Sequence, residues 1–189
     1  MEKNKTRDLV FTAMLVSLTV IMMFTPLGTL RLPMVSVTIA HIPAIVAAMV
    51  LGLWQGVAVA FVFGLISLFI ALTTPTGVLD PFFVNPLISI LPRVLIPVTT
   101  YFVYKALSGK INSKFAVGIS AVVGNLTNTF AVYAMLYLLY AKPIYETTGI
   151  PAFQYILGAI SVSTLIKTII VTLIVTPLVF ALKKIIKNA

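Results

Sequence analysis

The sequence predicts an all-α integral membrane protein, a six-transmembrane-helix bundle with the N-terminus and the C-terminus in the cytoplasm. Of its 189 residues, 60% are hydrophobic and 9% are charged, and the mean hydropathy is +1.14. Soluble domains carry roughly 25% charged residues. The apolar residues form about six runs, each near the ~20 residues needed to cross a bilayer. Basic residues gather just outside these runs, as orientation signals do.

The six runs are separated by segments rich in glycine and proline, which break helices. The second and third runs nearly touch, so the short junction Leu51-Gly-Leu-Trp-Gln-Gly56 predicts a tight antiparallel hairpin. The loop from Thr73 to Pro86 is long enough to act as a lid over a cavity. We expect a single domain over residues 1–189, with helices at about 9–26, 38–53, 55–72, 87–107, 115–140 and 155–182.

The distribution of cations predicts the orientation of the bundle. With the N-terminus in the cytoplasm, the outer segments hold only Arg31 and Lys142, and this bias follows the positive-inside rule. The net charge of +9 is therefore interpreted as a topology signal, and no nucleic-acid partner is expected. The cytoplasmic segments would hold Lys3, Lys5, Arg7, Lys105, Lys110, Lys114, Lys183, Lys184 and Lys187.

Two cations lie inside apolar runs, where a charge costs at least roughly 2.5 kcal/mol. Arg93 is about 9 Å below the outer end of the fourth helix and Lys167 about 18 Å below that of the sixth, at ~1.5 Å per residue. Together they predict a site for an anion that opens outward. The alternatives are an Arg93 side chain that extends to the outer headgroups and a Lys167 that pairs with a carbonyl inside the bundle.

Further polar residues lie at similar depths and are candidates for substrate binding. Asn125 and Asn128 share one face of the fifth helix, where their amides could read a polar ligand or join helices. His41, the only histidine, precedes Pro43 and is a ligand candidate or a hydrogen-bonded structural residue. Asn85, in the outer loop just before the fourth helix, completes the set.

Several catalytic classes are excluded by motifs that the sequence lacks. It has no cysteine, no G-x-x-x-x-G-K-[ST] nucleotide loop, and no H-E-x-x-H or G-x-S-x-G motif. Its four acidic residues are terminal or in loops, so no embedded carboxylate couples transport to protons or sodium. We expect no enzyme activity, no catalytic residues, no metal and no cofactor. The result is a cation-lined pocket without an energy source of its own.

The first helix carries a small-xxx-small step, Ala13-Met-Leu-Val-Ser17, which allows another helix to approach closely. Internal packing is the alternative use of such a step.

The chain resembles the S components of energy-coupling factor (ECF) vitamin transporters over nearly its whole length. The resemblance is carried by the opening from Arg7 to Ser17, by Val37-Thr-Ile-Ala-His41-Ile-Pro43, by Phe63-Gly64-Leu-Ile-Ser67, and by Asn85-Pro86 through Pro92-Arg93. It implies a subunit of the bacterial cytoplasmic membrane that binds one vitamin from outside. It also implies two kinds of partner, a membrane T component and two cytoplasmic ATPases that supply the energy.

The resemblance further implies that Ala13 and Ser17 dock on the T component, although Ser17 departs from the family's alanine. The stretch around His41 looks like pantothenate-type members, and a carboxylate suits two cations. Riboflavin and pyridoxine or a hydroxymethylpyrimidine remain alternative vitamins. A stand-alone secondary transporter and a structural membrane subunit remain alternative classes.

Overall fold

The computed structural model describes residues 5–26, 28–31, 36–75, 77 and 79–188. Lys3 and the side chain of Arg31, both used in the orientation argument, lie outside the described part of the chain. The described residues are mostly helical, with two short strands. The elements are α1 (Lys5–Phe24), β1 (Thr29–Arg31), β2 (Ser36–Thr38), α2 (Ile42–Val50), α3 (Leu53–Thr73), η1 (Asp80–Val84), α4 (Pro86–Ser89), α5 (Leu91–Leu107), α6 (Ser113–Thr148) and α7 (Ala152–Asn188).

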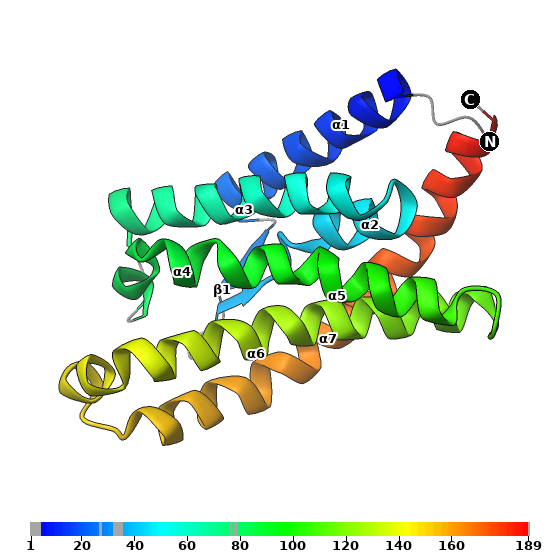
Figure 1. Ribbon diagram of the computed structural model, residues 1–189. Coiled ribbons are helices and arrows are strands. Elements are labelled where there is room, and N and C mark those ends of the chain that lie inside the picture. The colour runs from blue at the N-terminus through cyan, green and yellow to red at the C-terminus, as the bar shows by residue number, and fades with distance from the viewer. Residues whose placement is uncertain (1–4, 27, 32–35, 76, 78, 189) are drawn as a thin grey trace.

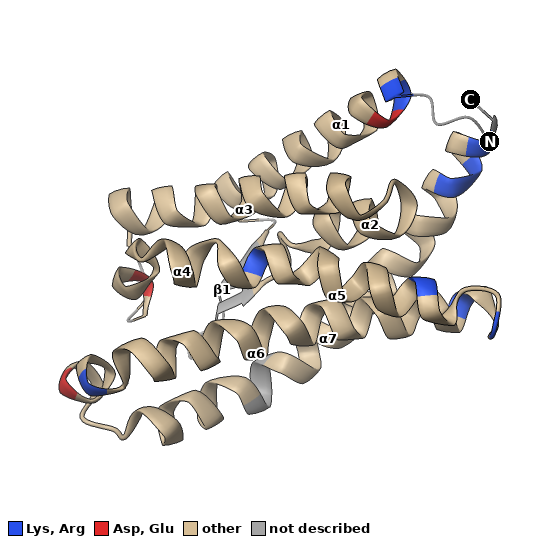
Figure 2. Ribbon diagram, in the orientation of Figure 1, with Lys and Arg blue, Asp and Glu red and all other residues tan. Residues whose placement is uncertain are grey.

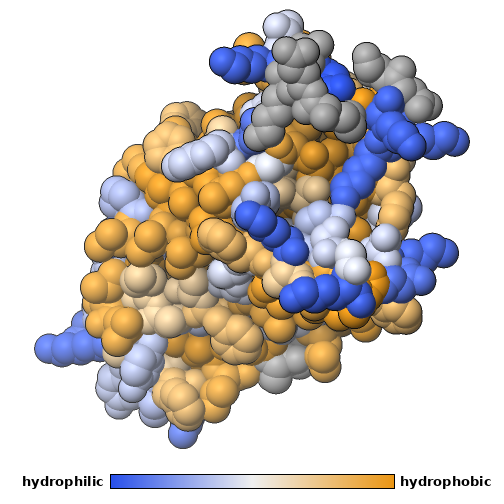
Figure 3. Space-filling model, turned by 45° about the vertical axis from the view of Figure 1, so that its right-hand side comes forward, coloured by the Kyte–Doolittle hydropathy of each residue, from blue (hydrophilic) through white to orange (hydrophobic). Residues whose placement is uncertain are grey.

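Five helical spans in the described residues are long and apolar enough to cross a membrane: α1, α3, α4 with α5, α6, and α7. The long helices lie side by side, and the chain's two ends lie at the same end of the bundle (Figure 1). Most Lys and Arg residues gather at that end (Figure 2). The flank between them and the far end is largely apolar (Figure 3). The fold is therefore that of a multi-pass helical membrane protein.

The predicted helix at 38–53 is wrong in its length, because the structure places a nine-residue helix, α2, at Ile42–Val50. Pro43 explains the start, since a proline has no backbone N–H and is tolerated best in the first turn of a helix. Gly52 explains the end, because its φ of +123° is one that residues with a side chain rarely adopt. At about 1.5 Å per residue, α2 is too short to cross a bilayer alone.

A small antiparallel ribbon precedes α2, and its second strand ends at Thr38, where the helix was predicted to begin. Thr29 pairs with Thr38, and Arg31 with Ser36, between β1 and β2. The ribbon and α2 together return the chain toward the end at which α1 begins (Figure 1). The predicted tight hairpin between the second and third helices is confirmed, since two residues, Leu51 and Gly52, join α2 to α3.

The fifth helix, predicted to end at residue 140, does break there, because α6 consists of two helical segments joined at a kink and the second one continues to Thr148. Tyr140 has non-helical backbone angles, φ −134° and ψ 23°, which kink the helix. The kink lies three residues before Pro143, which sits at the start of the continuing segment, where a missing N–H is tolerated. Gly149, with φ +69°, then ends the helix.

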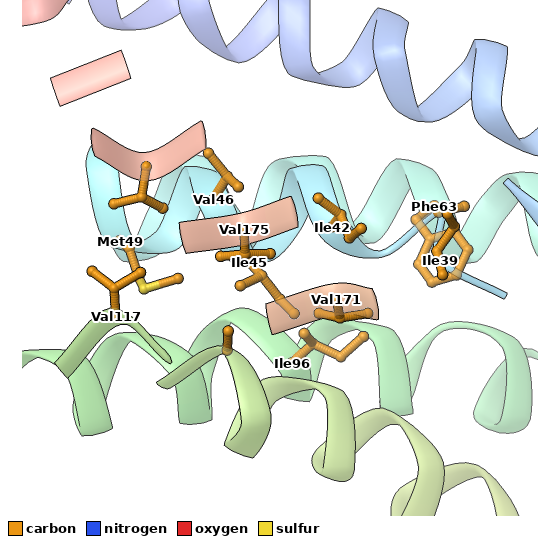
Figure 4. Packing of buried hydrophobic residues seen from close by; sticks show 13 residues of the cluster. Ile39, Ile42, Ile45, Val46, Met49, Phe63, Ile96, Val117, Val171 and Val175 are labelled. Atoms are coloured by element: carbon orange, nitrogen blue, oxygen red, sulfur yellow. The ribbon is translucent and has the colours of Figure 1, made fainter. Parts of the chain in front are cut away.

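Helix α2 is the centre of the hydrophobic core, and its residues from Ile42 to Met49 are all buried. Ile45 of α2, Ile96 of α5 and Val171 of α7 belong to one cluster, each with no exposed surface. Figure 4 shows side chains from these helices meeting around α2. Because the short helix is enclosed, the residue at its N-cap, His41, is held deep in the protein.

Gly64 sets the distance between α3 and the junction of α4 with α5. A Cβ atom at Gly64 would lie 2.9 Å from the Cα of Ile90 and 2.9 Å from the carbonyl oxygen of Ser89. Both are backbone atoms, so relief requires the helices to move apart. The same junction presents Arg93, which bonds back to α3.

We predict that Gly64→Ala lowers the stability of the purified protein by about 1–3 kcal/mol through this steric conflict. Thermal unfolding in detergent measures it. The control is Gly118→Ala, where the nearest atom to the new Cβ, Cγ2 of Thr172, is 3.7 Å away. Alanine gains about 1 kcal/mol of helix propensity there. Equal melting temperatures for the two variants would contradict the close approach.

Candidate functional site

A buried hydrogen-bond chain joins three segments at the middle of the bundle. Nε2 of His41, at the N-cap of α2, lies 3.1 Å from Oδ1 of Asn125 on α6. The Asn125 amide donates to Oγ1 of Thr168 on α7, at 2.7 Å. His41 and Asn125 have no exposed surface. With its side-chain oxygen bound to the imidazole, Asn125 fixes His41 as the hydrogen-bond donor from Nε2.

Lys167 lies in the same part of the bundle. Its Nζ donates to Oγ1 of Thr129 at 2.7 Å, and the Thr129 hydroxyl donates to the backbone carbonyl of Asn125 at 3.2 Å. Lys167 is 8% exposed. Lys167 therefore pairs with a threonine hydroxyl and not with a carbonyl, which was the predicted alternative. The hydroxyl is neutral, so it does not cancel the charge of the lysine.

Arg93, on α5, is 7% exposed and is held by neutral groups as well. One terminal nitrogen donates to the carbonyl of Ile88 at 2.6 Å, and the other donates to Oγ of Ser67 at 3.2 Å. The guanidinium carbon lies 5.5 Å from the ring centroid of Phe63 and 4.9 Å from that of Phe83. Aromatic faces attract cations. The side chain is therefore turned into the protein and does not extend to the outer headgroups.

Neither buried cation forms an ion pair with an acidic residue in the described part of the chain. Asp8 pairs with Arg7, Glu146 pairs with Lys142, and Asp80 accepts from the backbone N–H of Gly77.

Arg93 and Lys167 carry like charges, which repel one another. Lys167 is joined to His41 through Thr129 and Asn125. An anion bound there would relieve this repulsion and replace hydration that the cations lack.

The other predicted site residues differ in their surroundings. Asn128 is 7% exposed, and its side-chain oxygen Oδ1 is buried with no hydrogen-bond partner among the described residues. It lies on the same face of α6 as Asn125, so an acceptor remains for a ligand's donor. Asn85 instead caps α4 by accepting from the N–H of Leu87, and its amide donates to the Tyr140 hydroxyl at 3.3 Å. In this structure the Asn85 side chain joins α4 to α6.

Sequence reasoning missed the neutral residues that hold the cluster together: Thr129, Thr168, Ser67, Phe63 and Phe83. Thr129 could have been found, because it lies four residues after Asn125 and therefore on the same helix face. Thr168 follows Lys167 directly. The contacts of Ser67 and Phe83 with Arg93 depend on how α3 and η1 pack, which no local pattern reveals.

Ala13 and Ser17 are exposed on the outer face of α1. They lie beside exposed apolar residues such as Val10 and Met14, which are 53% and 60% exposed. The small-residue step is therefore not used for packing within the described part of the chain.

The described fold and site define a multi-pass helical membrane protein that holds two buried cations, Arg93 and Lys167, on neutral partners. Comparison with known families agrees with this class. Residues 7–179 match the family model described as "ECF transporter, substrate-specific component", and the chain belongs to this family. It is a transport component and not an enzyme.

Two curated relatives match over most of their lengths. One is the "Pantothenic acid transporter PanT" of Lactococcus lactis subsp. cremoris, 30% identical over 177 residues, which are 85% of this chain and 85% of that protein. The other is the "Pantothenate transporter PanT" of Leuconostoc mesenteroides subsp. mesenteroides, 26% identical over 176 residues, or 87% of this chain and 86% of that protein.

We predict that Thr129→Val destabilises the protein by about 1–3 kcal/mol, because Lys167 then loses its hydrogen-bond acceptor while remaining buried. Thermal unfolding in detergent without vitamin measures the effect. The matched control is Thr176→Val, since the Thr176 hydroxyl donates to the Thr172 carbonyl within α7. If Thr129→Val unfolds at the temperature of the control, Lys167 does not depend on Thr129.

Proposed function

We propose that this chain is the vitamin-binding subunit of an ECF-type importer and that its vitamin is pantothenate. The observation that carries the proposal is the presence of two buried cations, Arg93 and Lys167, whose partners in the described structure are neutral. The names of both curated relatives support pantothenate as the substrate.

Pantothenate fits the chemistry of the cluster. Its single carboxylate would lie between Arg93 and Lys167, where charge-assisted hydrogen bonds are strongest. Its amide and hydroxyl groups would be read by Asn125, Asn128 and His41, which provide both donors and acceptors. Riboflavin and pyridoxine have no carboxylate, so either vitamin would leave the repulsion between the two cations in place.

The energy for uptake would come from other chains. The chain has no nucleotide-binding loop, so a membrane T component and two cytoplasmic ATPases would drive transport. The exposed face of α1 around Ala13 and Ser17 would dock on the T component, because small residues let two helices approach closely. The basic end of the bundle would face the cytoplasm of a bacterial cell, with α2 and the ribbon completing a sixth passage.

A stand-alone transporter is the main rival, and reconstitution separates the two proposals. The purified chain in vesicles should bind pantothenate but should not accumulate it under a proton or sodium gradient. Accumulation under either gradient would overturn the proposed dependence on ATPases. A purely structural subunit would bind no vitamin at all.

We predict that Arg93→Met and Lys167→Met each weaken pantothenate binding by at least about ten-fold, because each removes a buried charge from the carboxylate site. Isothermal titration calorimetry of the purified variants measures the dissociation constant. Lys184→Met, which changes an exposed lysine near the end of α7, is the control and should bind normally. Equal losses in all three variants would reject the site.

We predict that Ala13→Trp or Ser17→Trp abolishes uptake by cells that contain the whole transporter, while the purified variant still binds pantothenate. The bulky ring would keep the T component's helix away from α1. Leu173→Trp, at a 69% exposed position on α7, is the control and should retain uptake. Loss of binding with intact assembly would show that α1 shapes the vitamin site instead.

A further inference from the structure

A groove on the flank of the bundle, between α6 and α7, has no part in the vitamin site. Its volume is about 550 Å³, and none of the residues predicted to bind substrate lines it. It follows α6 from Asn112 to Val123, and Thr172 and Thr176 of α7 form its other wall. At about 1.5 Å per residue the groove is roughly 16 Å long. One leaflet of a bilayer contributes about half of a ~30 Å hydrocarbon core, so the groove is about as long as one leaflet is thick.

The walls of the groove are apolar although two threonines contribute to them. The hydroxyls of Thr172 and Thr176 donate to the carbonyls of Thr168 and Thr172, each at 2.8 Å, so they are satisfied within α7. Gly118 has no side chain to fill the space opposite Thr172, whose Cγ2 would lie 3.7 Å from an added Cβ. These walls suit a hydrocarbon chain and offer a polar solute few partners.

One end of the groove is cationic. Lys114, in the first turn of α6, lines it together with Asn112, the N-cap residue. That end of the bundle carries most of the protein's Lys and Arg residues (Figures 2 and 3). The N-terminal turn of a helix adds a partial positive charge. The groove therefore offers a cation at headgroup level and an apolar channel that continues about one leaflet deep.

We propose that this groove binds one anionic phospholipid of the cytoplasmic leaflet, with an acyl chain between α6 and α7 and the headgroup phosphate beside Lys114. The charge and length of the groove together specify this occupant, since a zwitterionic lipid gains less from Lys114. The site is independent of the vitamin cluster, which lies nearer the middle of α6 and α7. Its occupancy would hold these two helices together at the basic end.

Native mass spectrometry of the full chain tests the site. The protein is delipidated in detergent and titrated with dioleoylphosphatidylglycerol or with dioleoylphosphatidylcholine. We expect one phosphatidylglycerol to bind in preference to phosphatidylcholine. Lys114→Gln should weaken phosphatidylglycerol about five-fold and leave phosphatidylcholine unchanged, because one lysine near a headgroup contributes roughly that factor. Lys110→Gln, in the loop before α6, is the matched control and should bind as the unaltered chain does.

Gly118→Leu should weaken both lipids, because the new side chain fills the apolar channel, whereas Gly118→Ala should have a smaller effect. Pantothenate binding and the melting temperature confirm that each variant is folded. Equal affinities for the two lipids, equal effects of Lys114→Gln and Lys110→Gln, or unchanged binding in a folded Gly118→Leu would each overturn the proposal. Retention of another membrane protein in the groove, lost on Gly118→Leu, would also overturn it in favour of a protein partner.

Discussion

The uncompensated charge of Arg93 and Lys167 is the constraint on which the rest of the site depends. Two cations in a low-dielectric interior repel each other, and the described structure holds them without an acidic partner. Arg93 is kept by a carbonyl, a hydroxyl and two aromatic rings, and Lys167 by one hydroxyl. Neutral partners tolerate the charges without neutralising them. Both charges therefore remain available to the carboxylate of the proposed vitamin.

The short helix α2 makes this arrangement possible. Because Pro43 and Gly52 confine it to nine residues, α2 lies enclosed among the longer helices and holds His41 at the level of Asn125. The close approach of α3 at Gly64 brings this helix against the backbone of Ser89 and Ile90. The Ser89 hydroxyl donates to the carbonyl of Phe83, and the ring of Phe83 faces the guanidinium of Arg93. Backbone geometry at two glycines and one proline therefore positions polar groups that lie on different helices.

The features that could be predicted from the sequence are those that depend on the hydrophobicity of each segment. The five long spans followed from apolar runs, and Arg93, Lys167 and Asn125 stood out as polar residues within those runs. The exact ends of the helices were harder to predict from the sequence. The predicted helix end at residue 140 matches the kink at Tyr140, but the sequence did not reveal the second helical segment that follows it to Thr148. The partners of Arg93 could not be predicted either, because Ser67 and Phe83 reach it only through packing between distant segments.

If the two buried cations select a carboxylate, a ligand that lacks only this group should bind much more weakly. Calorimetric titration of the purified chain with pantothenate and with pantothenol, in which an alcohol replaces the carboxylate, isolates that single group. We expect one site for pantothenate, and we expect pantothenol to bind more weakly by about 30-fold or more, because the buried charges then lack their partner. Equal affinities for the acid and the alcohol would contradict it.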